Sequence, residues 1–173
     1  MKQPAKNRFS AKKAARFGLL VALALIFSYA ESQIPPFFAV PGMKIGLTNV
    51  VVLTALYKMG SGPAMGVNLL RIFLVGLLFG NPFSVVYSLS GGMLSTVVMI
   101  LLRKSGRFRL ITVSVAGGVF HNVGQIAAAA VIMQTAQLGW YMVVLWFTGM
   151  LTGALIGVLG YEMVRRLPDA LFE

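Results

Sequence analysis

Six apolar segments follow one another along the chain, and short polar or glycine- and proline-containing stretches separate them. They cover about residues 17–29, 45–59, 63–80, 83–102, 110–134 and 139–164. Because only 11% of the residues are charged and 58% are hydrophobic, the chain has too little polar surface to cover a water-soluble globule. The pattern predicts an all-α integral membrane protein in which one domain, residues 17–166, contains six transmembrane helices.

The basic residues indicate how these helices are oriented. All fifteen Lys and Arg except Lys44 and Arg71 lie in segments that fall on one side of the membrane if the six spans alternate. Since cytoplasmic segments are enriched in Lys and Arg, we expect both termini in the cytoplasm, with residues 1–16 as a basic arm and residues 167–173 as a tail. The charges flank apolar runs and form no stripe on a polar domain, so nucleic-acid binding is not expected.

The first apolar segment permits a second interpretation. A basic arm, a short apolar core and the sequence "SYA" before Glu31 also resemble a signal peptide. Cleavage at that point would leave five spans with the same orientation.

The second apolar segment is unusually short. Its apolar run of about 14 residues forms roughly 21 Å of helix, whereas the hydrocarbon layer is about 30 Å thick. The proline-containing stretch "ESQIPPFFAVPGMK" precedes it, and irregular backbone at membrane depth is tolerated only against protein or a water-filled cavity. We therefore expect neighbouring helices to surround this segment, and a short span beside such a break indicates a binding site.

The nineteen glycines are expected to serve helix packing. The sequence "GSGPAMG" follows no predicted strand and has the spacing of neither a dinucleotide-binding nor a phosphate-binding loop. Small residues let helices approach closely in lipid. Four-residue spacing is found for Gly149, Gly153 and Gly157, for Gly76 and Gly80, and for Gly18 and Ala22. Each row can contact its own bundle or another subunit.

Arg71 lies near the middle of a sequence that could otherwise sit in hydrocarbon, where a charge costs at least about 2.5–3.5 kcal/mol. We therefore expect it to face a partner or a cavity. Asn68 shares its helix face, and polar residues of the other segments are expected in the same outer half of the bundle. The candidate ligand-binding residues are Arg71, Asn68, Asn49, Lys44, Asn81, Tyr87, His121, Asn122 and Gln125.

Two interpretations of this polar set remain open. In the first, Arg71 is neutralised inside the bundle, where Glu31 is the only acidic residue near the outer side, and the amides merely tie helices together. In the second, the set lines an outward-facing pocket for a small ligand. Because cations outnumber Glu31 in this region, that ligand is expected to be anionic or rich in acceptor oxygens, as carboxylates, phosphates and quinone-like carbonyls are.

Self-contained catalysis has little support in the sequence. The chain has four acidic residues, and they form no paired carboxylates, nucleophile triad or H-E-x-x-H motif. The single His has no neighbouring thiols or carboxylates with which to hold zinc or iron. We therefore lean against an enzyme and expect neither a metal nor another cofactor.

Three pieces of sequence, "MKIGLTN", "LLFGNPFS" and "HNVGQ", resemble the Gx transporter family of bacterial membrane proteins, commonly labelled heptaprenyl diphosphate synthase component I. The resemblance covers about residues 16–165. The wider pattern of a proline-containing loop, a short second helix, a "GP" turn and six spans is similar to the substrate-binding (S) components of energy-coupling-factor vitamin transporters. This resemblance implies an S-component-like bundle with an outward-opening pocket and a transmembrane coupling partner.

The synthase label implies prenyl chain elongation, which uses aspartate-rich motifs to bind Mg²⁺-diphosphate. Asp169 is the only aspartate in this chain, so the label implies at most a membrane accessory to a separate prenyl synthase subunit. S components often have an acidic residue in the third helix, where this chain has Asn68 and Arg71, and their known ligands are therefore not transferred to it.

The main functional hypothesis is a multi-pass protein of the bacterial cytoplasmic (inner) membrane. It binds a small molecule, anionic or quinone/prenyl-like, from the outer side and assists its transport with partner subunits, such as an ATP-driven coupling module. The alternative is a non-catalytic accessory subunit of polyprenyl diphosphate or quinone synthesis, or of membrane electron transfer. A purely structural membrane subunit is the third possibility.

Overall fold

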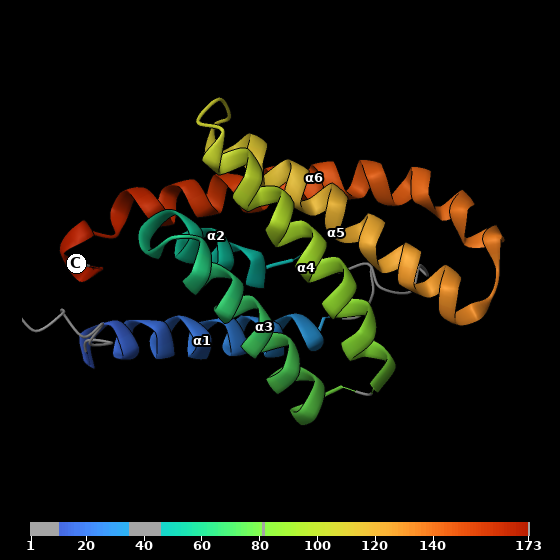
Figure 1. Ribbon diagram of the computed structural model, residues 1–173, viewed down its shortest axis with the longest axis horizontal. Coiled ribbons are helices and arrows are strands. Elements are labelled where there is room, and N and C mark those ends of the chain that lie inside the picture. Colours follow the sequence, from blue (N-terminus) through green and yellow to red (C-terminus); the bar gives the residue numbers. More distant parts are fainter. Residues whose placement is uncertain (1–10, 35–45, 81, 173) are drawn as a thin grey trace, which may run out of the picture.

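The computed structural model describes residues 11–34, 46–80 and 82–172, and every regular element in these ranges is helical. Six α-helices follow one another (Figure 1): α1 (Ala11–Ser32), α2 (Thr48–Met59), α3 (Ser61–Leu78), α4 (Pro82–Lys104), α5 (Leu110–Met133) and α6 (Tyr141–Arg166). The short 3₁₀ segments η1 (Ala136–Trp140) and η2 (Asp169–Leu171) flank α6. Within these ranges, the expectation of an all-helical protein with six helices is therefore confirmed.

Five of the helical segments are long and apolar enough to cross a membrane, which indicates a multi-pass membrane protein. They are α1, α3, α4, α5 and the stretch Gln137–Arg166 that contains α6. The remaining helix, α2, has 12 residues and is only about 18 Å long. The structure thus contains five candidate spans where the sequence predicts six, because α2 is too short to be counted among them.

The helix limits differ from the predicted ones mainly at two amino-terminal ends. Helix α1 begins at Ala11, so residues 11–16 of the predicted basic arm belong to a helix. Helix α2 begins at Thr48, and not near Ile45, which lies outside the described residues. Gly46 has a φ of 82°, a left-handed conformation that a right-handed helix cannot continue through.

Helix α2 is surrounded by its neighbours, as expected for so short an apolar segment. It contacts α1, α3 and α6, and the side chains of Val51, Leu53 and Leu56 are completely enclosed. Its buried Thr54 hydroxyl is satisfied within the helix, where it donates to the Val50 carbonyl at 2.9 Å. This buried helix forms the centre of the core around which the longer helices pack.

Helices α5 and α6 approach each other through glycines. The α6 row of Gly149, Gly153 and Gly157 therefore contacts α5 of its own bundle. A Cβ atom at Gly153 would lie 2.8 Å from Val115 Cα, and one at Gly118 would collide with the carbonyl oxygen of Gly149. By contrast, a Cβ at Gly18 would meet nothing within 4 Å. Packing is therefore confirmed for the α6 row, whereas Gly18 lies on an open face of α1.

Contacts between distant segments close one end of the bundle. Lys58, at the end of α2, donates a hydrogen bond to the Leu167 carbonyl at 2.8 Å and forms an ion pair with Asp169. Arg103 of α4 donates to the Tyr57 carbonyl at 3.3 Å, and its guanidinium carbon lies 5.1 Å from the centre of the Tyr57 ring. The carboxyl ends of α2, α4 and α6 are thereby held together.

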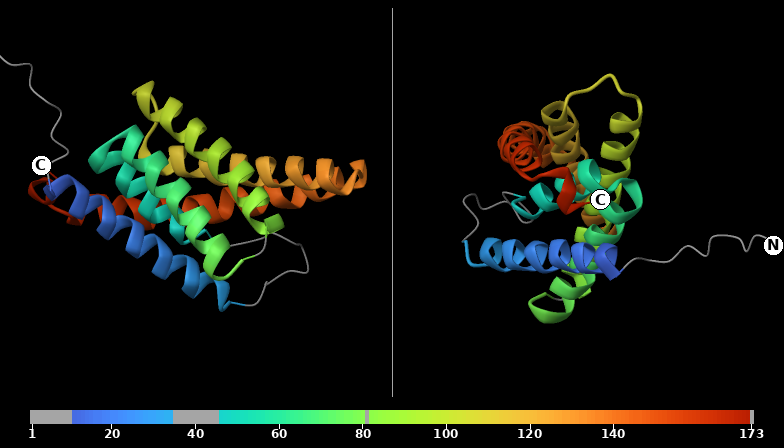
Figure 2. Two further views of the ribbon diagram at one scale, coloured as in Figure 1. Left: turned by 60° about the horizontal axis from the view of Figure 1, so that its bottom comes forward. Right: turned by 90° about the vertical axis from the view of Figure 1, so that its left-hand side faces the viewer.

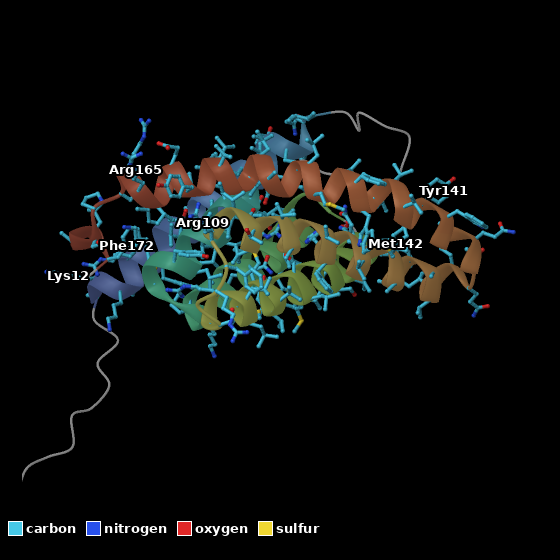
Figure 3. The ribbon with its side chains drawn as sticks, turned by 90° about the horizontal axis from the view of Figure 1, so that it is seen from above. Lys12, Arg109, Tyr141, Met142, Arg165 and Phe172 are labelled. Atoms are coloured by element: carbon cyan, nitrogen blue, oxygen red, sulfur yellow. The ribbon has the colours of Figure 1, made fainter. Side chains whose placement is uncertain are left out.

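Basic side chains collect at this same end. Figure 3 shows Lys12, Arg109 and Arg165 toward the end of the molecule that carries the carboxyl terminus, whereas Tyr141 and Met142 lie toward the opposite end. Figure 2 shows that the start of α1, the α2–α3 turn and the α4–α5 turn lie toward the first end, and the α5–α6 turn lies at the other. The structure therefore has a basic end and an opposite end that contains the aromatic start of α6.

We predict that Gly118→Ala separates α5 from α6 and destabilises the fold by about 1–3 kcal/mol, because its methyl group would overlap the Gly149 carbonyl. Unfolding of the purified protein by SDS, added to detergent micelles, measures this change. Gly18→Ala is the matched control, since it makes the same substitution in a helix where the new methyl group meets no protein atom. Equal stability of the two variants would contradict the packing assignment.

Candidate functional site

Two cavities adjoin the side chain of Arg71. The first has a volume of about 40 Å³ and is lined by residues from all six helices. Its polar lining residues are Glu31, Thr48, Asn49, Arg71, Ser114, His121, Asn122 and Thr152. The second has a volume of about 190 Å³ and lies between α1, α3 and α4, with Ser28, Glu31, Ser32, Arg71, Ser84 and Ser88 as its polar lining. Arg71 and Glu31 are the two charged residues that both linings share.

Asn68, one turn before Arg71 on α3, holds the guanidinium in place. Its side chain is only 1% exposed. Its amide nitrogen donates to the Gly92 carbonyl at 2.9 Å and to the Thr96 hydroxyl at 2.8 Å, both on α4. Its Oδ1 accepts a hydrogen bond of 3.0 Å from Arg71 Nε. Asn68 therefore lies behind Arg71 and orients it, and it lines neither cavity.

Gly92 of α4 packs against α3 at this point. A Cβ atom at Gly92 would lie 2.8 Å from Ile72 Cδ1 and 3.0 Å from Asn68 Nδ2. A side chain at position 92 would thus displace the amide that holds Arg71. Among the described residues, the guanidinium makes one hydrogen bond, and its Nε is the donor.

Glu31 comes from the last turn of α1 and is 9% exposed. Its Oε1 accepts a hydrogen bond from the backbone N–H of Gly46, just before α2. Glu31 also interacts electrostatically with Arg71. Glu31 is the acidic residue that the sequence offers as a neutralising partner of Arg71, and the structure places both groups at the same cavities.

The predicted binding residues do not all lie together. Arg71, Asn49, His121 and Asn122 line the first cavity. Asn122 also donates from its amide nitrogen to the Leu145 carbonyl at 2.7 Å, which ties α5 to α6. These four residues come from α2, α3 and α5, and only the folded bundle brings them together.

The other predicted residues fall elsewhere. Tyr87 and Gln125 line neither of these two cavities. Gln125 packs against α4. Its Cγ lies so close to Gly91 that a Cβ atom added to that glycine would be only 2.7 Å away. Lys44 and Asn81 lie outside the described residues.

Several lining residues were not among the predicted binding residues. Nothing in the sequence singles out Thr152, because single threonines are ordinary in apolar helices. Its hydroxyl makes the hydrogen bond usual for such residues, donating to the Thr148 carbonyl at 2.8 Å. Ser28 and Ser32, by contrast, flank Glu31 at helical spacing, and this polar face at the end of an apolar helix was a recognisable signal. Ser28 shares a 2.9 Å hydrogen bond with Thr48, which joins α1 to α2 beside the cavities.

The arrangement is suited to binding. A guanidinium offers up to five N–H donors in one plane, a carboxylate accepts, and serine or threonine hydroxyls do both. Within the described ranges, no group of three His, Cys, Asp or Glu is placed to hold a metal ion. These groups can hydrogen-bond and form ion pairs with a polar molecule, and they lie among apolar helices.

A family model described as heptaprenyl diphosphate synthase component I matches residues 20–163. No curated protein and no solved structure shows significant similarity to the chain. The matched range includes both cavities and most of all six helices.

We predict that Asn68→Ala destabilises the protein by about 2 kcal/mol, because the Gly92 carbonyl, the Thr96 hydroxyl and Arg71 Nε all lose a buried partner. SDS-induced unfolding measures the loss. Asn49→Ala is the matched control, since no hydrogen bond from the Asn49 side chain to a described residue is lost. If the two variants unfold at the same SDS concentration, Asn68 is not the anchor described above.

Proposed function

This polytopic membrane protein belongs to the heptaprenyl diphosphate synthase component I family, and we propose that it binds a small polar molecule at Arg71 from the outer side of the bacterial cytoplasmic membrane and assists its transport. Arg71 and the residues lining the adjoining cavities are the proposed binding groups. ATP-driven movement of the molecule would require partner subunits, because this sequence contains no ATPase motif.

The observation that carries this proposal is a guanidinium kept inside a membrane-length helix beside two cavities. Such a charge costs at least about 2.5–3.5 kcal/mol at the centre of a bilayer, so residues of this kind usually serve a pathway or a ligand. If its role were only structural, surrounding acceptors would enclose it. Instead, Asn68 fixes one edge of the guanidinium, and its other nitrogens make no hydrogen bond to described residues.

Binding from the outer side is supported by the distribution of charge. The basic end contains Lys58 and Arg103, whose contacts join the carboxyl ends of α2, α4 and α6. Arg71 lies in the half of α3 farther from that end, toward Leu78. Because basic ends of membrane proteins face the cytoplasm, we assign both termini to the cytoplasm. The second cavity, lined by the end of α1, the end of α3 and the start of α4, then lies toward the outer side.

The alternative function is a non-catalytic accessory subunit of polyprenyl diphosphate or quinone synthesis, and the description of the matched family supports it. In that case Arg71 would bind an acidic group of a prenyl or quinone intermediate. Recovery of a soluble prenyl synthase with the purified protein supports this alternative, whereas recovery of an ATPase module supports transport.

We predict that Arg71→Leu lowers the amount of small molecule retained through purification at least tenfold, because a charge-assisted hydrogen bond contributes about 1.5–3 kcal/mol. Mass spectrometry of extracts from matched preparations measures retention. Arg165→Leu is the control, as Arg165 is exposed in the last turn of α6. Equal retention by a normally inserted Arg71→Leu protein contradicts the proposal.

We also predict that Ser105→Cys, in the α4–α5 turn, reacts with a membrane-impermeant maleimide only after the cytoplasmic face is opened. Gln137→Cys, in η1, is expected to react in intact cells. Both positions are exposed, and the sequence contains no other cysteine, so each label has one possible site. The reverse pattern would contradict the proposed orientation.

A further inference from the structure

Arg71 and Glu31 face the same two cavities, yet they do not form an ion pair. The ion pairs among described residues are Lys58–Asp169 and Arg166–Glu162. Opposite charges in a low-dielectric environment attract strongly. Their separation inside the bundle therefore needs a structural cause.

Each charge is held by an anchor of its own. Arg71 Nε is bound to Asn68, whose amide is in turn fixed to α4. Glu31 Oε1 is bound to the backbone N–H of Gly46. These anchors lie on different segments, α3 with α4 in one case and the residues just before α2 in the other. The packing of the helices thus sets the separation between the two charges.

We propose that the ligand is a compact zwitterion whose acidic group binds Arg71 and whose cationic group binds Glu31. This inference rests on the proposed binding function and specifies its ligand. The described residues that line both cavities carry one positive and one negative charge. A ligand with both charges satisfies both groups, whereas a simple anion satisfies Arg71 and approaches the Glu31 carboxylate with a like charge.

The second cavity fits this class of molecule in size and lining. Its volume of about 190 Å³ is below the range of roughly 300–1,000 Å³ for pockets that hold drug-sized ligands. Serine hydroxyls, among them that of Ser88, make part of its lining polar, and Val75 and Phe79 provide apolar surface. A small body with polar ends matches this space, and a polyprenyl chain does not.

The zwitterion can be a free molecule or the headgroup of a lipid that enters between α1 and α4. The probes therefore form two sets. The soluble set compares neutral α-amino acids with the corresponding 2-hydroxy acids, which lack the ammonium, and with the corresponding amines, which lack the carboxylate. The lipid set compares short-chain phosphatidylethanolamine with short-chain phosphatidylglycerol, which lacks the ammonium.

The experiment measures the thermal stabilisation of the purified full-length protein in detergent by each probe. We expect a zwitterion in one set to bind at least tenfold more tightly than its matched anion and, in the soluble set, than its matched amine. The set that gives this preference identifies the source. Glu31→Gln, which keeps an acceptor for the Gly46 N–H, is expected to remove the preference for the zwitterion over the anion.

The outcomes separate this inference from the proposed function. A matched anion that binds as tightly as the zwitterion overturns the inference while leaving binding at Arg71 intact. Absence of stabilisation by every zwitterion also overturns it, and the retained molecule identified by mass spectrometry then still tests the proposed function. Because the probes are compared on the unaltered protein, a failure of Glu31→Gln to fold does not affect the result.

Discussion

The hydrogen bonds of Asn68 connect the packing of this protein to its candidate site. The amide joins α3 to α4 through Gly92 and Thr96, and its oxygen holds the guanidinium of Arg71. A membrane interior provides no water for polar groups, so an asparagine there must find all of its partners within the protein. Asn68 finds them on α4 and on its own helix, and this fixes both the α3–α4 contact and the orientation of the neighbouring charge.

The shortness of α2 provides the second condition for the site. A helix that ran the full thickness of the bundle would occupy the region beyond Thr48, where Gly46 instead turns the backbone and binds Glu31. Irregular backbone next to a cavity follows a pattern known from membrane transporters, in which interrupted helices leave polar main-chain groups near the ligand. The buried helix, the left-handed glycine and the anchored carboxylate thus form one local arrangement.

Both candidate functions use the same pair of charges differently. For transport, binding at Arg71 and Glu31 takes place on the side of the bundle away from the basic end, where Lys58 joins α2 to the carboxyl-terminal segment. For an accessory subunit, the same charges hold an intermediate for a separate enzyme. In both cases the protein supplies recognition in a low-dielectric environment, where matched charges have a large effect on affinity and unmatched ones are costly.

The sequence by itself determined which segments are helical, that α2 would be short and enclosed, and that Arg71 needed polar surroundings. These properties depend on local hydropathy, on glycine and proline, and on the cost of a charge in lipid, all of which can be read along the chain. The tertiary structure alone decided that Asn68 anchors Arg71, that Glu31 shares its cavities and that Gln125 packs against α4. Those outcomes depend on how each helix is rotated and which neighbour it contacts, and these are set by contacts between residues far apart in the sequence, such as Gly118 against Gly149.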